Sequence, residues 1–115
     1  DERIVQNGRF FTFKGGVGMT TKPTEIIIRK LSKVGCRPCA VLGYMLESIA
    51  DQLAKDNAVV SEHDIELEHD LIRRYEITSV PVLILERNGV EITRLNGMVS
   101  AEEVMDAVDY AKESR

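Results

Sequence analysis

Apolar and polar residues follow two different periods along this chain, and the two periods predict both helices and strands. In the middle of the chain, apolar residues recur every three or four positions: Leu42, Met45, Leu46, Ile49 and Leu53. This spacing predicts one amphipathic helix of about four turns, starting at Cys39 and ending near Asp56. A second helix should follow Ser100 and Glu103, which have the spacing of a capping box. Its predicted buried face is Val104, Ala107, Val108 and Ala111.

Shorter apolar segments separate these helices and predict strands. The segments are 25–31, 58–67, 82–85 and 90–95. The uninterrupted runs at 26–28 and 82–85 are typical of strands buried on both faces. Asn88-Gly89 predicts a tight hairpin, because both residues accept the positive φ angles of a type I′ turn. A short helix is expected over residues 69–75.

The order of these elements predicts how they pack. From residue 24 the order is strand, helix, strand, short helix, strand, strand, helix. Strands that alternate with helices favour parallel neighbours, and the hairpin adds an antiparallel pair. The expected fold is therefore α/β, with a mixed central sheet and helices on both faces.

The first residues predict an extension ahead of this domain. Asn7-Gly8 lies between apolar runs within residues 4–13, so a β-hairpin is expected there. Residues 14–21 resemble a phosphate-binding loop, but Met19 stands where that motif needs a lysine. We therefore expect a linker. The predicted division is 1–23 for the hairpin and linker, and 24–115 for the domain.

Composition narrows the class of protein. The chain has 115 residues, 43% of them apolar and 30% charged, which is ordinary for one globular domain. Its net charge of −4 disfavours nucleic acid and anionic membranes as partners. No apolar run approaches the roughly 18 residues of a membrane span. Two cysteines do not make a secreted disulfide framework, so a cytoplasmic location is expected.

The two cysteines carry the candidate chemistry. Cys36-Arg37-Pro38-Cys39 stands at the start of the predicted central helix, directly after a strand pattern. Two thiols three positions apart can close a small disulfide ring, and this context favours a redox pair. Unpaired N–H groups and the helix dipole would stabilise a Cys36 thiolate, which is the nucleophile of disulfide exchange. Cys39, one turn further along, should be more buried and should act as the resolving thiol.

Three alternatives remain open for this pair. The cysteines could be plain core residues. They could join His63 and His69 in a zinc site, although the histidines lack the usual H-x₃₋₅-H spacing, and both are expected on the solvated surface. The chain could also be a binding or structural module with little redox turnover. We expect no metal and no cofactor.

Four features together resemble the thioredoxin family over about residues 24–112. They are Cys36-Arg37-Pro38-Cys39 opening a helix, the segment 75–81 before a buried strand, the Asn88-Gly89 hairpin, and Gly97 before the capped last helix. The resemblance implies the thioredoxin fold and thiol–disulfide oxidoreductase activity. Disulfide-bearing proteins are the implied substrates, and thioredoxin reductase or glutathione the implied reductant. We expect a monomer.

The resemblance also implies roles around the two cysteines. Pro81 matches a cis proline that faces the disulfide, and the backbone of Val80 would pair with the substrate chain. Gly97 and Met98 would complete an apolar rim around Cys36. The remaining implied substrate-binding residues are Gly35, Arg37 and Pro38.

Four positions depart from the usual thioredoxin pattern, and one of them is Tyr44, which stands where the family has a proline in the active-site helix. Gly35 replaces a tryptophan, Arg37 replaces a glycine, and Lys30 stands where the family has a buried aspartate that helps to deprotonate the resolving cysteine. Loss of that aspartate should slow resolution by Cys39. The chain resembles a divergent thioredoxin, or a thioredoxin–glutaredoxin intermediate of the kind that phages encode. We expect a dithiol reductase weaker than an ordinary thioredoxin.

Overall fold

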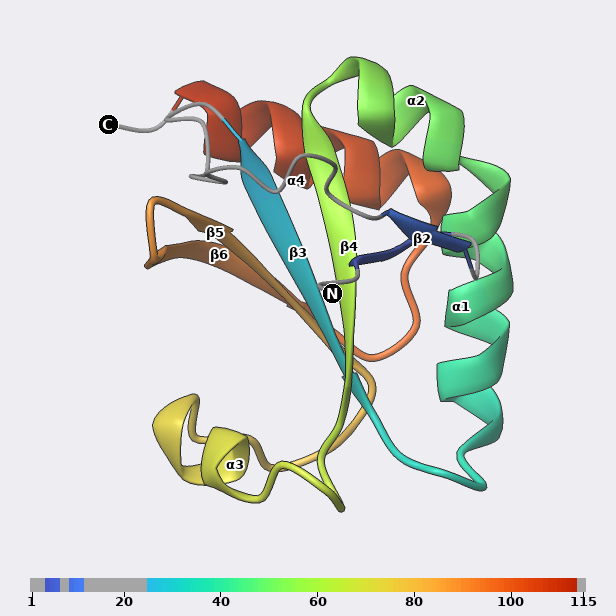
Figure 1. The fold of residues 1–115 in the computed structure, drawn as a ribbon, viewed down its shortest axis with the longest axis vertical. Coiled ribbons are helices and arrows are strands. Elements are labelled where there is room, and N and C mark those ends of the chain that lie inside the picture. Colours follow the sequence, from blue (N-terminus) through green and yellow to red (C-terminus); the bar gives the residue numbers. More distant parts are fainter. Residues whose placement is uncertain (1–3, 7–8, 12–24, 114–115) are drawn as a thin grey trace.

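A four-stranded mixed sheet forms the centre of the molecule (Figure 1). The computed structural model describes residues 4–6, 9–11 and 25–113. The strands of the sheet are β3 (Ile26–Ser32), β4 (Ala58–Asp64), β5 (Val82–Arg87) and β6 (Val90–Asn96), in the order β4-β3-β5-β6. β3 is parallel to β4 and antiparallel to β5, and β5 is antiparallel to β6. The predicted mixed sheet is confirmed.

Three helices cover one face of this sheet: α1 (Arg37–Ser48), α2 (Ala50–Lys55) and α4 (Ala101–Glu113). Their apolar sides meet alternate residues of the strands, because successive side chains of a strand point to opposite faces. The buried residues of this main core are Ile26, Ile28, Leu42, Leu46, Ile49, Leu53, Ala58, Val60, Leu83, Leu85, Val104, Ala107, Val108 and Ala111. All four residues predicted for the buried face of the last helix are among them.

The other face carries α3 (Asp70–Arg74), the short helix expected from the sequence. A smaller core lies beneath it, made of Leu31, Leu71, Tyr75, Ile77, Val82 and Ile84. β5 is buried on both faces, as predicted. The same prediction is wrong for β3, because Ile27 on the α3 face is only partly buried. The five residues of α3 are too few for the smaller core to extend that far along the strand.

The central helix is interrupted, whereas its apolar period predicted one continuous helix. The Ser48 hydroxyl donates to the Met45 carbonyl at 2.6 Å, and the Ile49 amide bonds to the Leu46 carbonyl at 3.2 Å. Serine side chains that compete for helix carbonyls in this way bend helices. α1 therefore ends at Ser48, and α2 continues the apolar stripe with the buried Leu53.

β4 ends three residues earlier than predicted. The Asp64 carboxylate accepts the Glu66 amide at 2.8 Å, and its carbonyl accepts the Leu67 amide at 2.9 Å. These bonds turn the chain away from the sheet, as aspartate commonly does at turns. Leu67 is consequently 83% exposed.

The predicted turn and capping residues are confirmed. Asn88 and Gly89 have φ angles of 55° and 80°, as a type I′ hairpin requires. Ser100 accepts the Glu103 amide at 3.1 Å, and Glu103 accepts the Ser100 amide at 2.8 Å. These reciprocal bonds fix the start of α4.

β1 (Ile4–Gln6) and β2 (Arg9–Phe11) pair antiparallel, with Gln6 opposite Arg9, as the predicted N-terminal hairpin requires. The predicted turn at Asn7-Gly8 lies outside the described residues. β1 lies beside β4 (Figure 1). The linker predicted over 14–21 lies outside the described residues.

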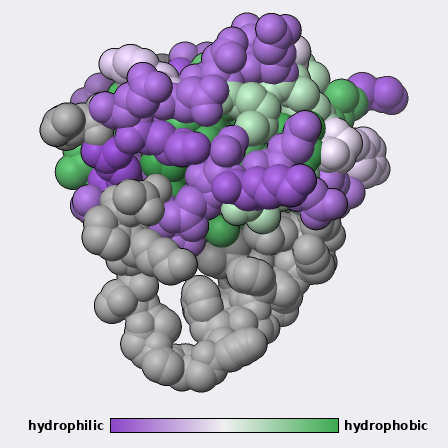
Figure 2. Space-filling model, turned by 90° about the horizontal axis from the view of Figure 1, so that it is seen from above, coloured by the Kyte–Doolittle hydropathy of each residue, from purple (hydrophilic) through white to green (hydrophobic). Residues whose placement is uncertain are grey.

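The end of the molecule away from α3 presents mainly hydrophilic side chains (Figure 2). Several large exposed apolar residues lie instead in segments near the start of α1, among them Val34 at 77% and Ile72 at 37% exposure. Within the described part of the chain, no helix has the length and apolar character needed to cross a membrane.

Candidate functional site

The two cysteines lie where β3 gives way to α1. Cys36 is the N-cap of α1, and it is joined by a disulfide to Cys39, with a Cα–Cα distance of 5.2 Å. The Cys36 sulfur accepts the backbone N–H of Cys39 at 3.1 Å. A helix N-terminus presents unpaired N–H groups and positive potential. The geometry thus places a hydrogen-bond donor on the sulfur that would carry negative charge after reduction.

The local sequence creates this position. Gly35 has a φ of 83°, in the left-handed region that glycine adopts without cost, and it turns the chain from β3 into the helix. Pro38 lies within the first turn of α1, where the missing N–H of proline is not needed.

The two cysteines differ in exposure as predicted. Cys36 is partly exposed, whereas Cys39 is 3% exposed. A reagent or substrate approaching from solvent can reach the first sulfur more readily than the second.

A hollow of about 600 Å³ opens beside Cys36. It is lined by Lys33, Gly35, Cys36, Arg37, Pro38, Ile65, Ile72, Ile77, Thr78, Ser79 and Val80. The structure therefore brings five of the predicted site residues together around one hollow. Ile65, Ile72 and Ile77 form an apolar wall that sequence reasoning missed, since they belong to three different segments of the chain.

The remaining predicted site residues are not among those that line the hollow. The Val80–Pro81 peptide bond is cis, as the resemblance implied, and Pro81 is buried. The Gly97 amide donates to the Pro81 carbonyl at 2.9 Å. This bond joins the residue that follows β6 to the residue that precedes β5. Met98 is 48% exposed. Pro81, Gly97 and Met98 do not line the hollow itself, and their predicted contact with substrate stays a prediction.

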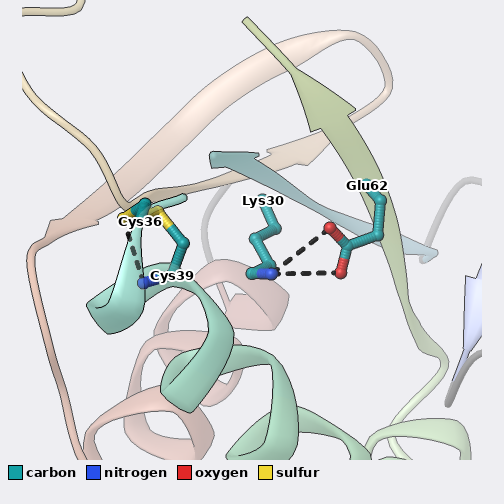
Figure 3. The surroundings of a disulfide bond; sticks show 4 residues. All are labelled: Lys30, Cys36, Cys39 and Glu62. Carbon is teal, nitrogen blue, oxygen red and sulfur yellow. Dashed lines mark hydrogen bonds and ion pairs between the residues drawn. A yellow bond between two sulfur atoms is a disulfide. The ribbon is translucent and has the colours of Figure 1, made fainter. Parts of the chain in front are cut away.

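An ion pair between a buried lysine and an exposed glutamate lies near the disulfide (Figure 3). Lys30 on β3 is 5% exposed, and its Nζ lies 3.3 Å from both carboxylate oxygens of Glu62 on β4. The two residues are direct partners in the parallel pairing of β3 and β4. Sequence reasoning noted Lys30 but missed Glu62. The signal was present, because each charge interrupts an alternating apolar stripe: Ile26, Ile28, then Lys30, and Ala58, Val60, then Glu62.

A second polar cluster lies on the α3 face of the same strands. Arg29 donates to Glu86 at 2.8 Å and to the Nε2 atom of His63 at 3.1 Å. Tyr75 donates a short hydrogen bond to Glu86. Burial, and then the bond to Glu86, raise the pKa of the Tyr75 phenol above its ordinary value of 10.0.

This cluster removes His63 from the zinc alternative. Because arginine can only donate, Nε2 of His63 is an acceptor, and Nδ1 faces Glu68 at 3.1 Å. The prediction of a solvated His63 is wrong, since its side chain is only 12% exposed, whereas His69 is exposed as expected. Among the described residues, no three histidine, cysteine or acidic side chains could together hold a metal ion.

Comparison with known proteins gives one consistent result. The thioredoxin family model matches residues 20–110. Thioredoxin-2 of Saccharomyces cerevisiae is 32% identical over 73 residues, which are 64% of this chain and 68% of that protein. The structure of a mutant thioredoxin from Halobacterium salinarum superposes with a TM-score of 0.70 at 22% identity, covering 80% of this chain and 79% of that one.

Some relatives are much longer than this chain. A putative protein disulfide-isomerase from Schizosaccharomyces pombe is 31% identical over 84 residues, which are 73% of this chain and 17% of that protein. The bifunctional thioredoxin reductase/thioredoxin of Mycobacterium leprae is 27% identical over 62 residues, 54% of this chain and 13% of that protein.

The fold, the cysteine pair at the start of α1 and the family match agree, and the chain belongs to the thioredoxin family. This membership, together with the cysteine pair at disulfide distance, supports a thiol–disulfide oxidoreductase.

Proposed function

We propose that this protein is a dithiol reductase that transfers two electrons from Cys36 and Cys39 to disulfides of protein substrates. The observation that carries the proposal is the asymmetry of the pair. Cys36 caps a helix and borders a hollow, while Cys39 is buried three residues away and already within bonding distance.

The reaction would proceed in two exchanges. The Cys36 thiolate attacks one sulfur of the substrate disulfide, a Cys36–substrate bond forms, and the other substrate sulfur leaves as a thiolate. The Cys39 thiolate then attacks the Cys36 sulfur, which closes the protein disulfide and releases the second substrate sulfur. The substrate gains two electrons and two protons, and the protein pair is oxidised.

The hollow would hold the chain on one side of the substrate disulfide. Its isoleucine wall suits an apolar side chain, while Gly35 and Val80 would border an extended backbone. Lys33 and Arg37 lie among its lining residues, which include no acidic one. We therefore expect faster reduction of disulfides that are flanked by acidic residues than of those flanked by lysine. The advantage should be about three- to tenfold at low salt and should shrink as salt is added.

A separate reductant must regenerate the Cys36–Cys39 dithiol after each turnover. The M. leprae relative carries a thioredoxin reductase in the same chain, and this supports a thioredoxin reductase as the electron source here. Glutathione is the other candidate. A reducing compartment such as the cytoplasm suits either source.

Insulin reduction tests the proposal. With dithiothreitol as reductant, the protein should accelerate insulin precipitation, and Cys36→Ser should abolish the acceleration. Cys39→Ser should trap a covalent complex with an insulin chain that reductant releases. Because the chain has no other cysteine, every adduct reports on one of these two sulfurs. An insulin rate equal to that of dithiothreitol alone would leave a binding module as the better description.

A further inference from the structure

Lys30 is a buried charge that the two exchanges above leave without a role. Ile26, Ile28 and Lys30 are alternate residues of β3, so they share the face that packs against α1. Lys30 is the one nearest the end of β3 that leads to Cys36. Its register neighbours on the two adjacent strands are Glu62 and Leu83. Of these two neighbours, Glu62 is charged and forms the ion pair with Lys30.

A glycine in α1 makes room for this ammonium. A Cβ atom placed on Gly43 would lie 3.1 Å from Nζ of Lys30, which is tighter than most contacts in proteins. Gly43 follows Cys39 by four residues, so it lies one helical turn below it, about 6 Å along the axis. Glycine inside a helix normally costs stability. At this position it lets a charged group approach the helix from beneath the resolving cysteine.

The two charges of the pair are unequal in their effect on Cys39. In the view of Figure 3, Nζ of Lys30 lies between Cys39 and the Glu62 carboxylate. The Lys30 side chain is 7% exposed, whereas that of Glu62 is 38% exposed and more strongly screened by water. The field at Cys39 should therefore be dominated by the positive end of the pair.

We propose that Lys30 is a positioning residue that stabilises the Cys39 thiolate during resolution, with Glu62 holding its ammonium beneath α1. The inference rests on the proposed reductase function. When Cys39 attacks Cys36, its proton goes to water, the Cys36–Cys39 bond forms, and the Cys36–substrate bond breaks. The leaving substrate thiolate then takes a proton from water. A cation held beneath Cys39 favours the ionised thiol that this step requires. Lys30 would thus assist resolution and offset part of the slowing that the sequence predicts from loss of the aspartate.

The elements around Cys39 supply few other charges. Its own helix contributes Cys36 and the exposed Arg37, and the preceding loop contributes the exposed Lys33. On the same face of the sheet, β5 contributes the apolar residues Leu83 and Leu85. Among the described residues, Lys30 is the buried cation on the α1 face of the sheet. Its removal should therefore change the ionisation of Cys39 more than removal of an exposed cation would.

The test measures ionisation of Cys39 alone, in a Cys36→Ser background, by following the ultraviolet absorbance of the thiolate against pH. Lys30→Met, which puts an unbranched apolar side chain of similar length in place of lysine, should raise the midpoint of Cys39 ionisation by about one pH unit. In the chain with both cysteines, the same change should slow decay of the mixed disulfide at neutral pH by about threefold, because the loss of thiolate is partly offset by the greater nucleophilicity of a more basic thiolate. Lys112→Met is the matched control, because Lys112 pairs with Asp56 at the same 3.3 Å, between α4 and the end of α2.

Exchanging the two charges separates an electrostatic role from a structural one. The double variant Lys30→Glu with Glu62→Lys keeps an ion pair but puts the negative charge at position 30. The midpoint of Cys39 ionisation should therefore rise above that of Lys30→Met. A midpoint restored to the wild-type value would show that only the pairing matters and would overturn the proposal. An unchanged midpoint in Lys30→Met would also overturn it.

A third variant covers the case in which the exchanged pair does not fold. Gly43→Ala should push Nζ away from the helix and raise the midpoint by less than Lys30→Met does. A lowered midpoint would contradict the inference. None of these titrations needs substrate turnover. Failure of insulin reduction with the shifts intact would therefore reject the reductase function alone, and active protein without the shifts would reject the role of Lys30 alone.

Discussion

Arg29 and Lys30 are consecutive residues of β3, yet they belong to very different surroundings. Arg29 points to the α3 face, where Glu86, His63 and Tyr75 complete a cluster with an Arg29–Glu86 contact of 2.8 Å. Lys30 points to the α1 face, where Glu62 pairs with it at 3.3 Å. Arg29 is held by two hydrogen bonds, at 2.8 and 3.1 Å, to residues of this cluster. Lys30 has longer contacts, at 3.3 Å, and lies near the Cys36–Cys39 disulfide.

The difference indicates what each charge contributes. A buried cluster whose members satisfy one another stabilises one arrangement of the core, and loss of a member leaves a buried charge unpaired. A buried cation with a single, partly exposed partner leaves more of its field to act on neighbouring groups. We therefore expect the α3-side cluster to determine stability and the α1-side pair to determine thiol reactivity.

The largest expected effect is on the α3 side. Glu86→Gln should lower the free energy of unfolding by about 2–3 kcal/mol, because it removes a charged hydrogen-bond partner of Arg29 in a buried site. The insulin rate per folded molecule should stay near wild type. Chemical denaturation supplies the stability, and Glu91→Gln, which breaks the more exposed pair with Arg94, is the control with an expected loss below about 1 kcal/mol. Equal losses in the two variants would remove the distinction between cluster and surface pair.

Lys30→Met should have a smaller effect on stability. It removes a buried ammonium and replaces it with an apolar side chain of similar length, while Glu62 is exposed enough to be solvated. We expect the free energy of unfolding to change by less than about 1 kcal/mol in either direction. The same denaturation experiment measures it. A loss as large as that of Glu86→Gln would mean that the α1-side pair is also chiefly structural.

The smallest effect is confined to alkaline pH. The raised pKa of Tyr75 means that the unfolded chain ionises this phenol at lower pH than the folded protein does. Its contribution to stability is therefore complete below pH 10, the ordinary phenol value, and is lost as pH rises through the folded pKa. Wild type should lose stability over this range more steeply than Tyr75→Phe. If the free energy of unfolding fell equally with pH in the two proteins, the raised pKa of Tyr75 would be contradicted.

Much of the fold was predictable because local signals agreed with the tertiary structure. The Asn88-Gly89 turn, the Ser100–Glu103 cap and the apolar face of α4 each specify their element without help from distant residues. The helix break at Ser48 was missed, because it depends on which carbonyl a hydroxyl meets and not on the apolar period.

The site was predictable in part for the same reason. Cys36 and Cys39 are three residues apart, so the chain itself determines their geometry. Glu62 and the isoleucine wall of the hollow reach the site only through strand pairing and packing. An alternating pattern shows that Lys30 and Glu62 point inward, but strand register is needed to pair them.

The central claim, that the Cys36–Cys39 pair donates electrons, is tested most directly by its reduction potential. The protein is equilibrated with glutathione buffers of known ratio, and the oxidised fraction is read after acid quenching and alkylation. Lys33, Arg37 and the helix terminus favour the reduced form modestly, so we predict a potential between about −210 and −270 mV, in the range of glutaredoxins and thioredoxin. A value more positive than about −150 mV would make the protein an oxidant and would contradict the account.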